Sequence, residues 1–289
     1  MNRAATAASE NACAGEGPVF EEHRLEAGHG IISYRECGHG PQTVVLLHGI
    51  SSGAASWSQC AGILGRHARV IAWNAPGYAD SSPLPMPVPS ALDYARQLAA
   101  LLAGLNVESC LLVGHSLGAL MAAAYGSAAG HLASRIVLMS PALGYQSEEK
   151  KPLADSVRAK RFQALEQDGL EAIAKRLPDR LLTASASPAQ RASVTQNALR
   201  LNPAGYRQAV EMLCSEDIER YVLDAGSAQV FCGDRDVVTT PEQSAAFAQR
   251  ARLPFALIEN AGHACYVEQP AVVANILSGL LARLGSEAG

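Results

Sequence analysis

The sequence predicts an α/β fold built on an open, mostly parallel sheet. Six short, nearly continuous apolar runs alternate with helical stretches, as parallel strands covered on both faces require. A long helical stretch, from residue 143 to about residue 223, breaks this alternation and contains no convincing strand. At 289 residues the chain is long enough for one large domain, or for one domain that carries an insertion.

The first predicted elements are a tail and a hairpin. Residues 1–18 are alanine-rich and lack a block of large apolar side chains, so we expect a disordered tail and no signal peptide. Residues 19–26 and 30–37 alternate loosely between apolar and polar, with an Ala-Gly-His connection at 27–29. This pattern predicts a hairpin exposed on one face.

Buried strands and covering helices follow in alternation. The predicted strands are 43–47, 69–73, 110–113, 135–139, 228–232 and 254–258, and the predicted helices are 91–105, 117–129, 241–251 and 270–284. We therefore expect a core domain made of residues 19–142 and 224–289. The remaining residues, 143–223, are predicted to form a helical insertion, or cap.

The cap is rich in charge. Residues 148–180 hold eight basic and seven acidic side chains. A basic substrate-binding patch is one interpretation, but side chains of opposite charge four residues apart pair readily on solvated helices. We favour mutual pairing.

Composition excludes several classes of function. Net charge is −4, and no run of Lys or Arg is long enough to follow a nucleic-acid backbone. No apolar run approaches the ~18 residues of a membrane helix. The seven cysteines are widely spaced and contain no CxxC pair, so we expect a cytoplasmic protein with small buried thiols, no metal site and no cofactor. The sequence is compatible with a homodimer.

Ser116 is the candidate nucleophile. It stands in Gly-His-Ser-Leu-Gly at residues 114–118, directly after a predicted strand and before a predicted helix. A serine on such a turn is held in a strained conformation, and the two flanking glycines remove Cβ atoms that would clash where strand and helix cross.

His263 is the candidate base. A serine hydroxyl is a weak nucleophile and needs a base within hydrogen-bond reach. His263 lies in a Gly-His loop after the last predicted strand, where the site of an open parallel sheet should lie. The other histidines are set aside by position: His23, His29, His39 and His67 before the nucleophile, His48 at a strand end, His115 beside the nucleophile with a diverging side chain, and His131 after a helix.

Two aspartates in one loop compete for the role of acid. Asp234 follows the glycine at a strand end and is suited to an Asx-type hydrogen bond within the turn, whereas Asp236 lies far enough out to reach the next loop. We favour Asp236. Asp80 precedes the nucleophile and is interpreted as a turn residue.

Backbone amides are the expected oxyanion donors. One is Leu117, at the start of the helix behind the nucleophile, and the other is Ile50, or Ser51, in the His-Gly loop after a strand. Each donor would stabilise the transition state by ~3 kcal/mol. The absence of Gly-Lys-Ser/Thr and GxGxxG gives nucleotide binding little support.

With these residues assembled, the chain resembles the α/β-hydrolase superfamily from about residue 19 to residue 284. The resemblance is carried by five features: the loop at His48-Gly49, the turn at Pro76-Gly77, the elbow at 114–118, the loop ending at Asp236, and Gly262-His263. It implies a mostly parallel eight-stranded sheet with a helical cap between strands six and seven. It also implies that Asp236 is the acid and that Leu117 and Ile50 form the oxyanion hole.

Within the superfamily, residues 48–57, 202–206 and 209–213 are similar to bacterial 3-oxoadipate enol-lactonases. The leading hypothesis is thus a serine hydrolase that opens a small carboxylic ester or lactone with water. A hydrolase of carbon–carbon bonds in aromatic ring-fission products ranks second, because those proteins usually carry Gly-Pro-Gly where this chain has Ser51-Ser52-Gly53. A non-catalytic domain that binds a ligand or protein ranks third.

Overall fold

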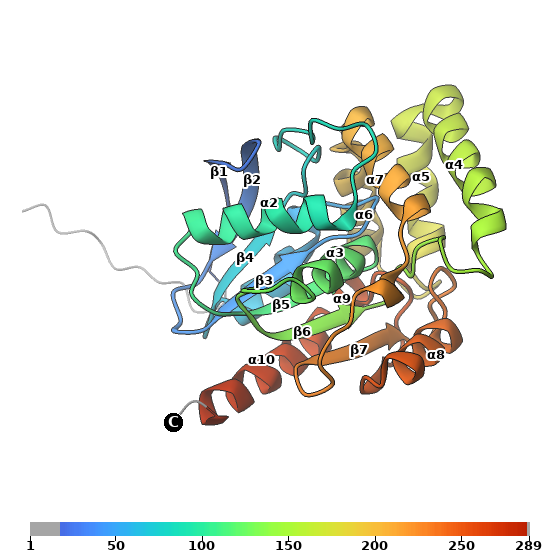
Figure 1. The fold of residues 1–289 in the computed structure, drawn as a ribbon. Coiled ribbons are helices and arrows are strands. Elements are labelled where there is room, and N and C mark those ends of the chain that lie inside the picture. The colour runs from blue at the N-terminus through green and yellow to red at the C-terminus, as the bar shows by residue number, and fades with distance from the viewer. Residues whose placement is uncertain (1–17, 288–289) are drawn as a thin grey trace, which may run out of the picture.

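One eight-stranded sheet organises the molecule, which a computed structural model describes over residues 18–287. The strand order is β1-β2-β4-β3-β5-β6-β7-β8 (Figure 1). β1 and β2 pair antiparallel, as do β2 and β4, and all other neighbours are parallel. The strands are β1 Glu21–Ala27, β2 Gly30–Cys37, β3 Thr43–Leu47, β4 Arg69–Trp73, β5 Cys110–His115, β6 Ala133–Met139, β7 Ala228–Gly233 and β8 Phe255–Ile258. The predicted fold class is confirmed. Of the tail predicted for residues 1–18, residues 1–17 lie outside the described residues.

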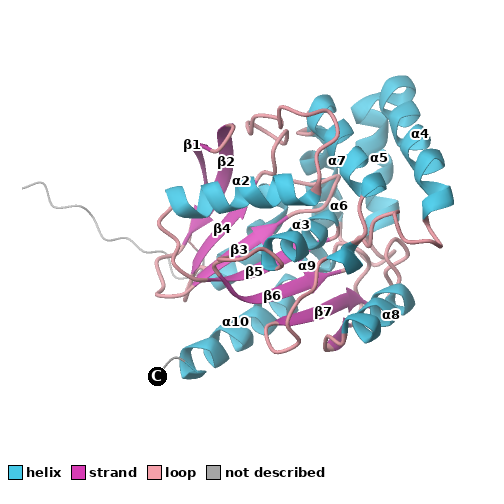
Figure 2. Cartoon of the chain, in the orientation of Figure 1, coloured by secondary structure: helices cyan, strands magenta, loops and turns pink. Residues whose placement is uncertain are grey.

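Helices cover both faces of the sheet. α2 and α3 pack against each other in front of it, and α10 runs behind it against α1 (Figure 2). Their bounds are α1 Ser58–Leu64, α2 Ala91–Gly104, α3 Leu117–Gly126, α8 Pro241–Ala251, α9 Cys265–Glu268 and α10 Pro270–Glu287. None of the helices in the described part of the chain combines the length and the apolar character needed to cross a bilayer.

Some local details differ from the predicted elements, chiefly at α1 and at the end of α3. Helix α1 is not among the predicted helices, because seven residues are too few to show a clear helical period. α3 ends at Gly126, three residues before the predicted end. The chain turns there, and the Tyr125 hydroxyl accepts a hydrogen bond from the amide of Leu132, 3.1 Å away.

The core is centred on β3, β5 and α3. Residues 44–47 of β3 are fully buried, and every residue of β5 is buried. Residues 117–125 of α3 are buried on all sides, as expected of a helix without a polar face. The element that follows the candidate nucleophile is therefore held by packing along its whole length.

A helical segment connects β6 to β7, as predicted. We call residues 143–223 the cap; within it α4 packs on α7 and α5 on α6. In Figure 1 these helices lie together beyond the arrowheads of the parallel strands. Their bounds are α4 Ala154–Gln163, α5 Gly169–Leu181, α6 Pro188–Leu199 and α7 Pro203–Ser215. The cap thus lies at the carboxyl edge of the sheet, where the loops that carry the candidate site residues begin.

The described cysteines are small core residues. Cys37, Cys60, Cys110, Cys214, Cys232 and Cys265 are all buried and none forms a disulfide. Burial raises the pKa of Cys60 to about 12, so its thiol stays protonated near neutral pH.

Candidate active site

Ser116 occupies a strained turn between β5 and α3. Its backbone has φ 53° and ψ −115°, a region that residues with a Cβ seldom adopt. Three hydrogen bonds fix the turn: its amide donates to the carbonyl of Met139 at 2.9 Å, and its carbonyl accepts from the amides of Ala119 and Ala142 at 3.0 and 3.1 Å. The strained turn predicted for Ser116 is present.

The glycines on either side of Ser116 are required by close backbone approach. A Cβ on Gly114 would lie 2.3 Å from the carbonyl oxygen of Gly118. A Cβ on Gly118 would lie 2.6 Å from the carbonyl oxygen of Leu47 and 2.7 Å from that of His48. Strand and helix can cross at this distance only without these side chains.

His263 and Asp236 form a buried pair. The loops that carry them follow β8 and β7, which are neighbouring parallel strands. His263 Nδ1 lies 2.8 Å from Asp236 Oδ2, and both side chains are almost fully buried. Thr239 Oγ1 donates to the same carboxylate oxygen at 3.0 Å and lies 3.3 Å from His263 Nδ1. The bond at Nδ1 leaves the opposite ring nitrogen, Nε2, for other chemistry.

The carboxyl of Asp236 is held ionised. Burial alone would raise its pKa, but the hydrogen bond and charge of His263, together with the amides of Val238 and Thr239, outweigh burial and hold the pKa well below its usual range. Those amides donate to Asp236 Oδ1 at 2.7 and 3.0 Å. A fixed anion at this point would orient the imidazole and stabilise its cation.

The structure separates the other acidic candidates from this pair. Asp234 Oδ1 accepts from the amide of Ala261 at 3.0 Å, so it joins two loops instead of serving its own turn, and the Asx-type bond predicted for it is made by Asp236. Asp80 forms an exposed ion pair with Arg24, 2.7 Å across.

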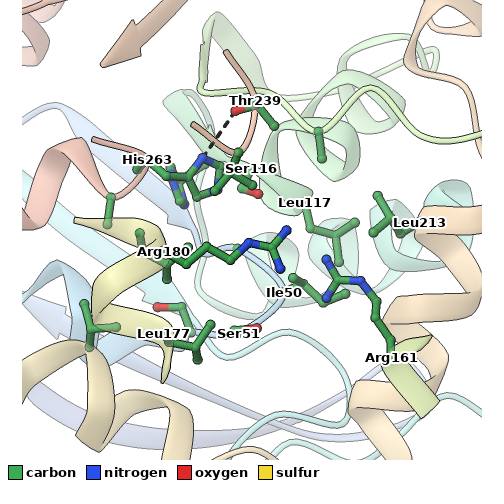
Figure 3. A pocket seen from close by; sticks show the side chains of 18 of the residues that line it. Ile50, Ser51, Ser116, Leu117, Arg161, Leu177, Arg180, Leu213, Thr239 and His263 are labelled. Carbon is green, nitrogen blue, oxygen red and sulfur yellow. Dashed lines mark hydrogen bonds between the residues drawn. The ribbon is translucent and has the colours of Figure 1, made fainter. Parts of the chain in front are cut away.

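Ser116 and His263 face the same pocket. This cavity of about 510 Å³ lies between sheet and cap, and the two residues lie next to one another in Figure 3. Ile50, Ser51 and Leu117 also line it. Leu117 is the first residue of α3, where an amide has no acceptor within the helix. The predicted oxyanion donors therefore border the cavity that Ser116 faces.

His48 and His115, which were not predicted to be the base, are both buried and hydrogen-bonded. His48 Nε2 accepts from the amide of Ala75 at 3.0 Å and its Nδ1 donates to the carbonyl of Gly49 at 2.9 Å, which agrees with a structural role in the loop. The prediction that the His115 side chain diverges from the site is wrong: His115 lines the pocket, and its ring centroid lies 4.8 Å from that of His263. Sequence adjacency gave no signal of this contact.

The predicted charge pairing in the cap is only partly present. Arg158 pairs with Asp155 and Glu211. Arg161 and Arg180 instead line the pocket. Among the described residues, no group of three or more His, Cys, Asp or Glu side chains is arranged to hold a metal ion.

Comparison with known families gives one match over most of the chain. The model described as the alpha/beta hydrolase family matches residues 44–276. Solved structures agree in fold: the enol-lactonase of Burkholderia xenovorans LB400 has a TM-score of 0.78 at 20% identity and covers 90% of this chain and 100% of that one. A thermophilic esterase from Thermogutta terrifontis has a TM-score of 0.76 at 22% identity, covering 91% and 98%.

Curated relatives match over a shorter stretch. A 2-hydroxy-6-oxononadienedioate/2-hydroxy-6-oxononatrienedioate hydrolase from Paraburkholderia xenovorans is 30% identical over 131 residues, which are 43% of this chain and 45% of that protein. One from Dechloromonas aromatica is 28% identical over 121 residues, 40% and 42% of the two chains. The chain thus spans less than half the length of the curated relatives it matches.

Proposed function

Because this chain belongs to the alpha/beta hydrolase family, we propose that it is a serine hydrolase that cleaves a carboxylic ester or lactone in the pocket between sheet and cap. Ser116 is the nucleophile, His263 the base and Asp236 the acid. The amides of Leu117 and Ile50 form the oxyanion hole. The observation that carries the proposal is that His263, bound to the buried Asp236 at 2.8 Å, lines the same cavity as the strained Ser116.

The reaction would proceed in two halves. In the first, the Ser116 hydroxyl adds to the substrate carbonyl while His263 Nε2 takes its proton, and the oxygen that becomes negative accepts hydrogen bonds from the two amides. Collapse of this intermediate expels the alcohol, which receives the proton from His263. In the second half, water attacks the acyl-enzyme by the same steps and releases the acid.

The nucleophile can be tested by one variant and two measurements. Ser116→Ala should abolish release of 4-nitrophenol from short 4-nitrophenyl esters and abolish covalent labelling by a fluorophosphonate, with an unchanged circular dichroism spectrum. Ser127→Ala, which changes an exposed serine after α3, is the matched control. Hydrolysis by Ser116→Ala at the parent rate would show that another group attacks. Failure of the folded parent to label would favour a non-catalytic binding domain.

A second candidate activity is cleavage of a carbon–carbon bond in a ring-fission dienoate. Two relatives described as 2-hydroxy-6-oxononadienedioate/2-hydroxy-6-oxononatrienedioate hydrolases favour this activity, although this chain matches less than half of the length of each. A coloured 2-hydroxy-6-oxo-dienoate separates the two activities, because breaking its carbon–carbon bond removes the absorbance and an esterase leaves it unchanged. Turnover of the dienoate at a higher kcat/KM than any ester or lactone in a screen would replace the first proposal with this one.

A further inference from the structure

The Lys and Arg side chains that line the pocket have no acidic counterpart among the described lining residues. Five basic side chains border the cavity and all come from the cap, whereas no Asp or Glu is among the described residues that line it. The five are Lys150, Lys160, Arg161, Arg176 and Arg180. Walls of one charge raise the local concentration of oppositely charged solutes. The molecule as a whole has a net charge of −4, so this feature belongs to the pocket and not to overall composition.

Two of these arginines lack a carboxylate partner. Arg176 is paired with Asp168. Within the part of the chain that the structure describes, Arg161 and Arg180 form no ion pair; the hydrogen bond of Arg161 goes from Nη1 to the hydroxyl of the buried Tyr206, 3.1 Å away. Figure 3 shows the two guanidinium groups reaching into the pocket from different cap helices.

Holding two cations in one cavity has an electrostatic cost. Burial and the nearby charge of Arg161 lower the pKa of Arg180, although a guanidinium stays charged at neutral pH. An anion placed between the two groups would remove this repulsion. The planar donors of arginine match the two oxygens of a carboxylate in particular.

Apolar side chains make up much of the pocket surface near these arginines. Leu177 and Leu213 from the cap, and Ile50 and Leu117 from the core, lie around the guanidinium groups and Ser116 in Figure 3. A ligand that fits this surface has an apolar segment together with an anionic end. A neutral aliphatic ester would satisfy the apolar walls and leave both cations unpaired.

We propose that Arg161 and Arg180 form a carboxylate subsite, and that the substrate is an ester or lactone that carries a free carboxylate in addition to the bond that is cleaved. This inference rests on the proposed serine hydrolase function. The subsite would bind the anionic end, and the apolar walls would hold the segment between it and the carbonyl that Ser116 attacks. Water is the second reactant, and the products are an acid and an alcohol, or a hydroxy acid from a lactone.

Matched pairs of substrates test the charge preference. On the acyl side, 4-nitrophenyl hydrogen pimelate is compared with 4-nitrophenyl heptanoate, which has the same chain length without the carboxylate. On the alcohol side, 4-acetoxyphenylacetate is compared with 4-methylphenyl acetate. We expect kcat/KM to be ~10- to 100-fold higher for the charged member of at least one pair, as charge-assisted hydrogen bonds allow. No preference for the charged member in either pair would overturn the subsite.

Three variants connect the preference to these side chains. Arg161→Gln and Arg180→Gln should each lower the ratio of charged to neutral kcat/KM by ~10-fold or more. Arg191→Gln is the control, because Arg191 pairs with Asp179 and does not line the pocket, and it should leave the ratio unchanged. Equal ratios in the parent and both pocket variants would contradict the proposal.

A binding measurement separates failure of the subsite from failure of the function. Calorimetry with pimelate and Ser116→Ala protein reports carboxylate binding without turnover, and Arg180→Gln added to Ser116→Ala should abolish it. Pimelate binding that depends on Arg180 supports the subsite even where no ester is cleaved. If the parent hydrolyses esters but the Ser116→Ala protein does not bind pimelate, the subsite is overturned and the hydrolase proposal stands.

Discussion

The imidazole of His115 donates a hydrogen bond from Nε2 to the backbone carbonyl of His263, 2.8 Å away. His115 adjoins Ser116 in sequence, so this bond ties the turn of the nucleophile to the loop of the base. Its Nδ1 is buried and has no hydrogen-bond partner among residues 18–287, and burial lowers the pKa of His115 to about 3. The ring is therefore neutral at neutral pH.

Removing this tie should slow turnover more than it weakens binding. In His115→Leu the carbonyl of His263 loses its donor and the loop can shift, and small misplacements of a catalytic group can cost ~100-fold. We expect kcat for a 4-nitrophenyl ester to fall by roughly 10- to 100-fold with a smaller change in KM. His115→Gln, which can donate to the same carbonyl, should recover part of kcat. Equal kcat in the parent and His115→Leu would exclude a positioning role.

The two loop aspartates should differ sharply when substituted. Asp236→Asn removes the charge that orients His263, and we expect kcat to fall by a factor on the order of 10⁴. Asp234→Asn weakens a hydrogen bond to the amide of Ala261 and should cost about 1 kcal/mol of stability with kcat largely retained. Steady-state kinetics and urea unfolding of both variants check this. The reverse order of kcat losses would assign the acid to Asp234.

Gly205 should resist substitution where the cap meets the core. A Cβ on Gly205 would lie 1.9 Å from the carbonyl oxygen of Gly77. Both groups belong to rigid backbone, so we expect Gly205→Ala to lower the free energy of unfolding by roughly 1–3 kcal/mol or more. Gly62→Ala is the matched control, because, apart from its chain neighbours and the backbone of its own helix, no described atom lies within 4 Å of the added Cβ, and alanine favours the helix by about 0.5–1 kcal/mol. Urea unfolding at one pH gives both values, and equal stability of Gly205→Ala and the parent would disprove this close contact.

Stability should fall as the solution is acidified from pH 7 to pH 5. Burial lowers the pKa of His48 to about 4, partly offset by its bond to Gly49, whereas an unfolded histidine has a pKa near 6.5. Between these values the unfolded chain binds a proton that the folded chain does not, so stability is lost as pH falls through 6.5 and the loss levels off below about pH 4. For His48 alone we expect the free energy of unfolding to be about 2 kcal/mol lower at pH 5 than at pH 7.

Urea unfolding at the two pH values measures this loss. Burial also lowers the pKa of His115, so the parent should lose more stability than His48 alone accounts for. In His48→Gln the loss between pH 7 and pH 5 should be smaller than in the parent. An identical loss in both proteins would show that His48 does not carry the effect.

The sheet and the position of the nucleophile could be predicted from the sequence because both depend on local pattern. Runs such as residues 43–47 and 110–113 are apolar throughout, and a strand buried on both faces needs that pattern. The glycines at 114 and 118 mark a crossing that no larger residue permits. Helix α1 gave no such signal because it is a single short stretch whose burial depends on α10.

The partners of charged and polar side chains could not be predicted in the same way. Charges spaced along a helix have the same pattern whether they pair with each other or face a cavity. Arg158 pairs with Glu211 on α7, 53 residues away, whereas Arg161, about one turn further along α4, donates a hydrogen bond to the Tyr206 hydroxyl. Likewise, the positions of the two aspartates in the sequence favoured Asp236 as the acid. The structure shows that Asp236 binds His263 and that Asp234 binds the amide of Ala261.

The sequence by itself determined where the strands, most of the helices and the serine turn lie, because burial and close backbone contact constrain which residues can occupy successive positions. Only the tertiary structure decided which side chains meet: His115 with His263, Asp236 with His263, and Arg161 with Arg180 in one pocket, where neither forms an ion pair with a described residue. The physical reason is that hydrogen bonds and ion pairs join atoms brought together by packing of distant segments, and residue order along the chain carries no direct record of that distance.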